Sequence, residues 1–293
     1  MKDRPAIPES VKREVRQRCG FGCVICGSPI YHYDHMDQWA LTKEHNAETL
    51  TLLCGSHHDE ATRGILHREK IRSANNKPFN KIKGLSSKHP LHYDDAQEYD
   101  IVLGDNLFTF SKYTVRTGNS VYLAVIENEP LLQLTFDEGM VYLSCQFYDF
   151  NNKLVLKIDK NELVYSIDHW DITFVGTCLK INNAARDITL EIVFDTPAKM
   201  TITKAKLYFN GVYIRINENG IERNLTRDNR STLKFNIKIP NRPDTTRAFR
   251  NANFRNFDCV LLFGPMPNFV INTCLHFTVP EGILGEYLQD GAA

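Results

Sequence analysis

Three cysteines and two adjacent histidines near the start of the chain constrain its fold more than any other feature. Cys23 and Cys26 are separated by two residues, and Cys54 is followed by His57 and His58. Each short spacing puts two metal-binding atoms on one tight turn, and four such atoms form the closed tetrahedral set of a structural zinc site. The spacing therefore predicts that Cys23, Cys26, Cys54 and His57 bind Zn²⁺.

Other ligand-type side chains remain beside this set. Asp34 and His35 lie between the two cysteine-containing turns, and His58 directly follows the predicted zinc ligand His57. Oxygen and imidazole donors suit a harder divalent ion with open coordination positions, of the kind used in catalysis. We therefore expect Asp34, His35 and His58 to lie at a second, catalytic ion, Mg²⁺ or Mn²⁺.

Composition indicates a globular protein of two domains. The chain has 293 residues, 42% of them hydrophobic, and its formal net charge is zero. It is long enough for two cores, and any surface for a polyanion must be local. It contains no apolar run long enough to cross a bilayer and no hydrophobic signal segment at Met1, so we expect a cytoplasmic protein without membrane association. In that reducing compartment the other cysteines are expected to be buried free thiols; they are Cys19, Cys145, Cys178, Cys259 and Cys274.

Local patterns predict a small mixed module over residues 1–73. Val11 and Val15 lie at helical spacing after Ser10, which predicts a helix with Ser10 as its N-cap. Residues 50–53 form a short apolar run that predicts a strand leading to Cys54. A helix is expected after it, ending at Gly64.

The rest of the chain has a different periodicity. Residues 74–97, rich in Asn, Lys, Pro and Ser, are predicted to be a linker. In residues 98–293, many short segments alternate apolar and polar residues between turn signals such as Asn151-Asn152 and Asn210-Gly211. The overall prediction is an α+β protein in which the module precedes a β-rich domain, either a sandwich or a solenoid-like stack.

One segment of the β-rich domain is strongly basic. Residues 221–256 contain many arginines and lysines and few acids, for example Arg242, Arg247 and Arg250. They form either a solvated face or a surface that contacts phosphates.

The N-terminal motifs resemble a known enzyme family. Cys23-Val-Ile-Cys26-Gly, Tyr33-Asp34-His35 and the run from Glu48 to Cys54-Gly-Ser-His57-His58 are similar, in order and spacing, to the zinc-bearing form of the HNH (His-Asn-His, ββα-metal) endonucleases. The resemblance covers roughly residues 12–65. It implies a ββα fold, His35 as the general base that activates water, and Asp34 and His58 as ligands of the catalytic ion. It further implies a double-stranded DNA substrate, contacted mainly through its backbone.

The chain departs from this family at one position. The middle Asn of the motif is replaced by Thr49, which cannot supply the amide geometry of Asn. We expect Thr49 to occupy the orienting position, with His45 or Asn46 of the preceding loop as alternatives.

Two other interpretations stay open. A zinc-dependent nucleic-acid-binding or interaction protein without hydrolytic activity would also use the four zinc ligands, and Thr49 would then mark the lost activity. By analogy with other fusions of such modules, the β-rich domain is expected to sense a trigger, bind a regulatory partner or form a homo-oligomer, as in microbial defence effectors.

Overall fold

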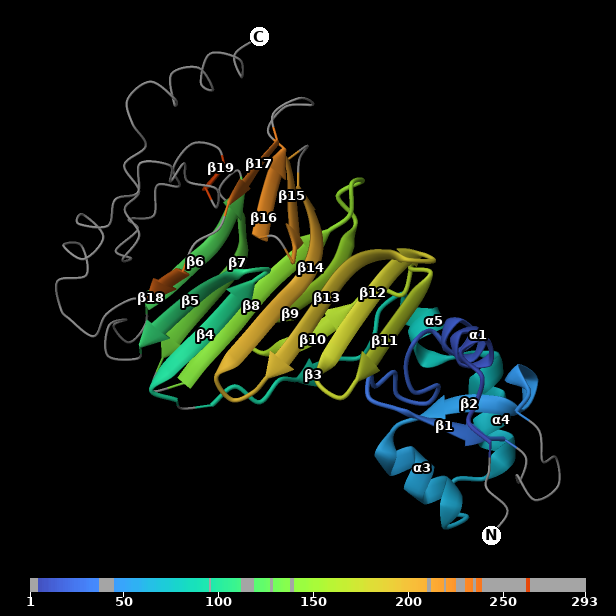
Figure 1. The fold of residues 1–293 in the computed structure, drawn as a ribbon. Coiled ribbons are helices and arrows are strands. Elements are labelled where there is room, and N and C mark those ends of the chain that lie inside the picture. Colours follow the sequence, from blue (N-terminus) through green and yellow to red (C-terminus); the bar gives the residue numbers. More distant parts are fainter. Residues whose placement is uncertain are drawn as a thin grey trace, which may run out of the picture.

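The computed structural model shows a small N-terminal unit beside a larger β unit (Figure 1). It describes residues 5–36, 45–94, 96–111, 119–126, 129–137, 140–209, 212–218, 220–224, 230–233, 236–238 and 262–263. We call the described residues up to Lys83 the N-terminal unit, and those from His89 onward the β unit.

The N-terminal unit contains two paired strands and several short helices. They are α1 (Glu9–Cys19), β1 (His32–His35), the 3-10 turn η1 (Ala47–Thr49), β2 (Leu50–Leu53), α3 (Gly55–Thr62), α4 (Arg68–Asn76) and α5 (Phe79–Lys83). The predicted strand 50–53 is confirmed, and the helix after it ends just before Gly64, whose φ is 76°. The N-cap prediction is wrong. α1 starts two residues earlier than expected, at Glu9 after the N-cap residue Pro8, whose fixed φ suits a helix entry, and no side chain caps it.

A compact apolar cluster holds this unit together. Val15 and Cys19 of α1 pack with Leu50, Leu52 and Ile71, all of them fully buried. β1 and β2 pair antiparallel, with Asp34 opposite Thr51 and His35 opposite Leu50. Cys19 is therefore a buried free thiol, as expected.

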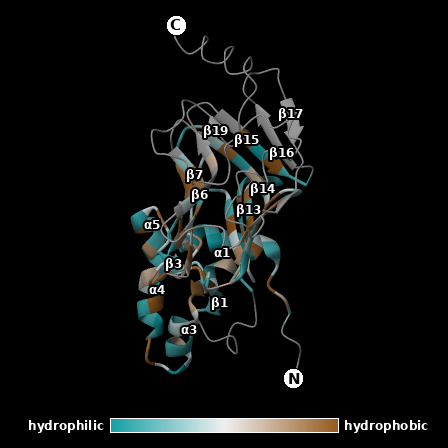
Figure 2. Cartoon of the chain, turned by 90° about the vertical axis from the view of Figure 1, so that its left-hand side faces the viewer, coloured by the Kyte–Doolittle hydropathy of each residue, from teal (hydrophilic) through white to brown (hydrophobic). Residues whose placement is uncertain are grey.

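The β unit confirms the predicted β-rich character. Its strands are β3 (His89–Pro90), β4 (Glu98–Leu103), β5 (Asn106–Ser111), β6 (Asn119–Ile126), β7 (Glu129–Asp137), β8 (Met140–Tyr148), β9 (Leu154–Asp159), β10 (Glu162–Tyr165), β11 (Asp171–Val175), β12 (Cys178–Ala184), β13 (Asp187–Asp195), β14 (Lys199–Phe209), β15 (Val212–Asn217), β16 (Gly220–Asn224), β17 (Arg230–Leu233), β18 (Asn236–Lys238) and β19 (Leu262–Phe263). Hydrophobic and hydrophilic residues alternate along them (Figure 2), and in β8 every second residue is buried. This period of two gives the sheet one face for the core and one for solvent.

The strands form one connected sheet that curls round a single core. Two antiparallel meanders, β6 to β10 and β11 to β17, meet at β14. The first half of β14 pairs with β13 and with β4, whereas its second half pairs with β15 and, at Tyr208, with Tyr148 of β8. The β13–β14 ladder has a register shift between Glu191 and Ile192 and ends at Leu190 opposite Ala205. The result is neither two separate sheets nor a parallel stack, so both the sandwich and the solenoid differ from the fold found.

Residues 74–97, predicted as a linker, contain ordered elements. They include the end of α4, all of α5 and the short strand β3, which pairs with β10. Asn80 of α5 is fully buried and donates a hydrogen bond from Nδ2 to the Gly20 carbonyl oxygen. The polar composition that suggested a linker thus serves specific backbone contacts.

Two sequence predictions concern segments that are described only in part. Within the basic stretch 221–256, the structure describes strands β16 to β18, and Arg242, Arg247 and Arg250 lie outside the described residues. Cys259, Cys274 and the Asn210-Gly211 turn also lie outside them. None of the helices that the structure describes is both long enough and apolar enough to cross a membrane.

Candidate metal centre and its surroundings

The first pair of metal-ligand candidates lies on a tight turn braced from two sides. Within the turn the Gly27 N–H donates to the Cys23 carbonyl oxygen at 2.7 Å, and Gly27 has a φ of 77°. A Cβ on Gly27 would lie 2.3 Å from Oδ1 of Asn80, so only glycine fits. The Val24 N–H donates to Leu52 of β2 at 3.0 Å, which fixes the turn against the strand that leads to Cys54.

The second pair comes from the start of α3. Cys54 is the N-cap residue of this helix, and His57 lies three residues further, on the same helical face. The next residue, His58, points about 100° away round the helix axis, so the two adjacent histidines face different surroundings.

Cys23, Cys26, Cys54 and His57 form a group that could hold a metal ion. Their ligand atoms all lie within 4.8 Å of one another. The Sγ atoms of Cys26 and Cys54 are 3.8 Å apart, and Nδ1 of His57 lies 3.1 Å from Sγ of Cys54 and 3.4 Å from Sγ of Cys23. In a tetrahedron with metal–sulfur bonds of ~2.3 Å, two sulfurs are roughly 3.8 Å apart, and a sulfur and a nitrogen slightly less. The donor set therefore fits a tetrahedral ion of the size of zinc.

The pKa values of Cys23 and Cys26 are shifted in opposite directions. The hydrogen bond with Cys26 lowers the pKa of Cys23 to about 4, against the opposing effect of burial. The same hydrogen bond raises the pKa of Cys26, because the two sulfurs share one proton when no cation is bound. A metal ion would replace that proton and favour both thiolates.

Asp34 and His58, predicted to share a second ion, lie side by side. Oδ1 of Asp34 is 3.6 Å from Nε2 of His58, and the His58 ring packs 5.5 Å from the ring of His32. The Asp34 side chain is 8% exposed and that of His58 is 42% exposed, so the pair opens to solvent on the α3 side. One oxygen and one imidazole nitrogen at this separation can both contact one divalent ion, which needs bonds of roughly 2.0–2.2 Å.

Arg68, which the sequence did not single out, is the other partner of Asp34. Its Nη1 lies 2.5 Å from Oδ2 of Asp34 and donates to the His35 carbonyl oxygen at 2.9 Å. Arg68 is the first residue of α4, and only the three-dimensional fold brings it to β1. It fixes the orientation of the Asp34 carboxylate and of the backbone at His35.

His35 is buried at the end of β1. Its ring lies 5.4 Å from the ring of His45, and the residue is 6% exposed. His35 directly follows Asp34 in the sequence and is the last residue of β1.

Thr49 makes local contacts in the turn before β2. Its hydroxyl donates to the Asn46 carbonyl oxygen at 3.0 Å, and its own carbonyl oxygen accepts from Met36 N–H at 2.8 Å. The Asn46 side chain accepts from Glu48 N–H at 2.9 Å. Thr49 and Asn46 therefore both shape the loop that faces the end of β1.

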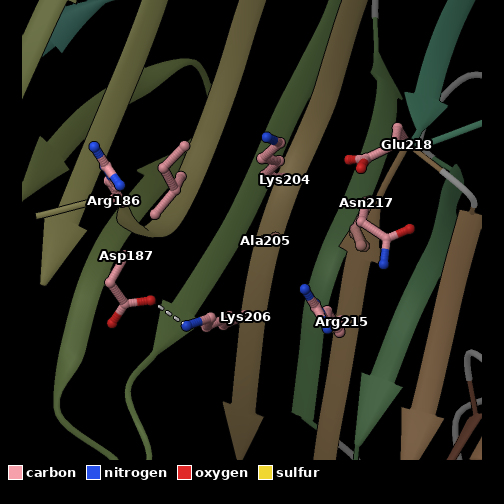
Figure 3. Close-up of a pocket in the computed structure, with 10 residues that line it drawn as sticks. Arg186, Asp187, Lys204, Ala205, Lys206, Arg215, Asn217 and Glu218 are labelled. Atoms are coloured by element: carbon pink, nitrogen blue, oxygen red, sulfur yellow. Dashed lines mark hydrogen bonds and ion pairs between the residues drawn. The ribbon is translucent and has the colours of Figure 1, made fainter. Parts of the chain in front are cut away.

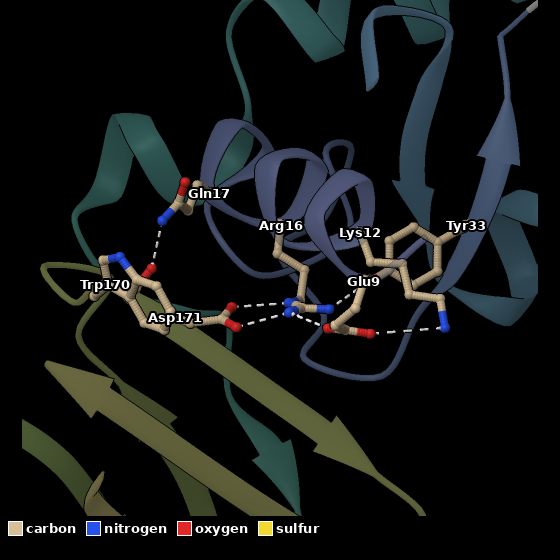
Figure 4. A network of polar contacts seen from close by, with 7 residues as sticks. All are labelled: Glu9, Lys12, Arg16, Gln17, Tyr33, Trp170 and Asp171. Carbon is tan, nitrogen blue, oxygen red and sulfur yellow. Dashed lines mark hydrogen bonds and ion pairs between the residues drawn. The ribbon is translucent and has the colours of Figure 1, made fainter. Parts of the chain in front are cut away.

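A buried polar network joins the N-terminal unit to the β unit (Figure 4). Arg16 of α1 donates two hydrogen bonds to the Asp171 carboxylate, at 2.8 and 2.7 Å, and further bonds to Tyr33 and Glu9. Beside it Gln17 donates to the Trp170 carbonyl oxygen, and the Arg13 guanidinium lies 4.6 Å from the Trp170 ring centre. Because Tyr33 precedes Asp34 on β1, Arg16 links the β unit to the strand that carries the candidate site.

Comparisons of the chain with family models, with characterised proteins and with solved structures give no match. The function is therefore inferred from the geometry of the site.

Proposed function

We propose that this protein is a metal-dependent endonuclease that hydrolyses phosphodiester bonds of double-stranded DNA. The observation that carries the proposal is the Asp34–His58 pair, 3.6 Å apart, next to the Cys23/Cys26/Cys54/His57 group on a strand–strand–helix unit. Phosphodiester hydrolysis needs an activated water molecule and positive charge near the phosphate. Asp34, His58 and His35 are residue types that meet these two needs.

In this proposal the first metal group has a structural role. Zn²⁺ bound by Cys23, Cys26, Cys54 and His57 fixes the turn before β1 to the start of α3. Because β1 carries Asp34 and α3 carries His58, the zinc group sets the distance between them. A second ion, Mg²⁺ or Mn²⁺, held by Asp34 and His58 would supply charge against the scissile phosphate.

The chain's own residues supply the proton transfer and the positioning. His35 accepts a proton from the attacking water as the general base, a role for which the imidazole side chain is suited. Arg68 holds the Asp34 carboxylate and the His35 backbone in one orientation. Thr49 takes the orienting position of the motif through the loop that faces His35.

One observation favours a second candidate, a zinc-dependent nucleic-acid-binding protein without hydrolytic activity. Arg68 already neutralises the Asp34 carboxylate, which a catalytic ion would otherwise do. In that case Arg68 would replace the second ion permanently.

Plasmid cleavage separates the two candidates. Purified protein with supercoiled DNA and Mg²⁺ or Mn²⁺ is expected to nick or linearise it, and His35→Ala is expected to abolish cleavage while DNA binding and zinc content persist. The matched control is His92→Ala, because His92 is an exposed residue of the β unit, between β3 and β4. Wild-type protein that retains zinc and binds DNA but cleaves nothing with either ion would support the non-catalytic candidate.

A further inference from the structure

The β unit has a charged pocket that the proposed nuclease site does not use. It lies between β13, β14 and β15 and has a volume of about 200 Å³ (Figure 3). Its charged lining residues are Arg186, Asp187, Lys204, Lys206, Arg215 and Glu218.

The pocket arises where the sheet divides. β13 pairs with β14 as far as Leu190 opposite Ala205. Among the described residues, the β13–β14 pairing does not continue to residues 187–189. β14 goes on with β15, so a gap opens between the start of β13 and Lys206. An ion pair between Asp187 and Lys206 spans it.

Positive charge is concentrated round this gap. Four basic and two acidic side chains line the pocket, although the whole chain is neutral. Lys206 stands directly opposite Arg215 in the β14–β15 ladder. Like charges in directly opposed positions repel each other. Asp187 already pairs with Lys206, and an anion beside Lys206 and Arg215 would bring further negative charge to both.

The backbone of one wall residue is also unusual. Arg186, at the β12–β13 turn, has a φ of 64°, an uncommon conformation for a residue other than glycine.

The size of the pocket limits the ligand. Sites that enclose a drug-sized molecule measure roughly 300–1,000 Å³, so this pocket is too small for a whole nucleotide. It has room for one or two phosphate groups. Guanidinium and ammonium groups are the side chains that bind phosphate oxygens best, because their hydrogen bonds are charge-assisted.

We propose that this pocket binds the phosphate end of a small phosphorylated molecule, with Lys206 and Arg215 as the main contacts. The rest of the ligand lies outside, over Arg186 and Lys204. The site is independent of the metal centre. One wall of the pocket is on β13. There Ile188 pairs with Asn182 of the neighbouring strand β12, and Asn182 pairs with Asp171 of the next strand, β11. Two strand spacings, or roughly 10 Å, thus separate the pocket wall from the contact with Arg16.

Calorimetric titration of the full-length protein with pyrophosphate and with inorganic phosphate tests this proposal without any cleavage assay. We expect saturable binding of pyrophosphate that Arg215→Gln weakens about tenfold and Lys206→Gln/Arg215→Gln weakens further, since each charge-assisted bond is worth at least one factor of roughly ten. The control is Lys153→Gln, which removes an exposed lysine of another surface ion pair. Thermal melting of each variant checks that it is folded.

Three results would overturn the proposal. One is equal pyrophosphate affinity in wild type and both pocket variants, and another is no saturable binding to folded wild-type protein. The third is that the protein binds a DNA duplex but not pyrophosphate, and that the two variants weaken this DNA binding. The pocket would then be part of a nucleic-acid surface. None of these results depends on whether the protein is a nuclease.

Discussion

Arg16 and Asp171, 155 positions apart in the chain, form a buried, two-bond ion pair between the N-terminal unit and the β unit. Both side chains are nearly inaccessible, 4% and 10% exposed. Burial lowers the pKa of Arg16, but the hydrogen bonds with Asp171 and Glu9 outweigh it and raise the pKa overall. Arg16 thus stays charged at any ordinary pH. The pair has neighbours that also join the units, such as the Tyr165 hydroxyl that donates to the Phe21 carbonyl oxygen at 2.6 Å.

Breaking this pair is expected to destabilise the protein strongly. Arg16→Met leaves the Asp171 carboxylate buried without its partner, and such a loss costs about 3–5 kcal/mol. We expect a lower denaturation midpoint and separate unfolding of the two units, measured by calorimetry. The control is Lys153→Met, which removes a 3.0 Å pair with Asp168 whose side chains are 66% and 78% exposed. That change should cost at most about 1 kcal/mol. Equal effects of the two substitutions would show that the Arg16 pair does not hold the units together.

Metal removal is expected to unfold the N-terminal unit alone. Its core is small, so the ion's binding energy is part of its folding energy. Cys23→Ser or Cys54→Ser should lose about one equivalent of zinc and the α-helical signal of this unit, while the β unit still melts cooperatively. Cys178→Ser is the control, because Cys178 is a free thiol on β12 of the β unit. If elemental analysis finds one equivalent of zinc in both Cys23→Ser and Cys54→Ser, the assignment of the four zinc ligands is wrong.

The sequence allowed the local chemistry to be predicted better than the long-range contacts. The spacing of Cys23, Cys26, Cys54 and His57 predicted a metal group, because each pair of ligands lies on one short turn. The period-two pattern likewise predicted strands such as β8. Arg16 and Arg68 could not be recognised, because their partners Asp171 and Asp34 come close only after the chain has folded.

The form of the sheet was also beyond local patterns. Whether strands form a sandwich, a stack or one curled sheet depends on which strands pair across the chain. Here the pairing of β14 with β13 and β4 in its first half and with β15 and β8 in its second half decides it. Residues 74–97 were predicted as a linker from their composition, but the fit of Asn80 against Gly20 and Gly27 gives them a packing role.

Arg68 is expected to compete with a divalent ion for Asp34. Its guanidinium occupies Oδ2 at 2.5 Å, and its positive charge disfavours a second cation nearby. Arg68→Ala should therefore lower the Kd for Mn²⁺ several-fold in zinc-loaded protein, as measured by Mn²⁺ electron paramagnetic resonance. Arg68→Lys keeps the charge and should leave the Kd near that of the wild type. Unchanged Mn²⁺ affinity in Arg68→Ala would mean that Asp34 does not bind the second ion, and Asp34→Asn would then have no effect on it either.

Thr49 is expected to act by shaping its loop. Its hydroxyl makes one hydrogen bond, to the Asn46 carbonyl oxygen, and a single such bond contributes about 0.5–1.5 kcal/mol. Thr49→Ala should therefore lower the cleavage rate only modestly, whereas Thr49→Asn, which supplies an amide side chain at this position, should retain or raise it under the proposed function. Asn46→Ala removes the side-chain bond to Glu48 N–H in the same turn and is the informative comparison. If Thr49→Ala has no effect on plasmid cleavage and Asn46→Ala is inactive with its zinc retained, the orienting role belongs to Asn46. Thr49 then serves only as the residue that leads into β2.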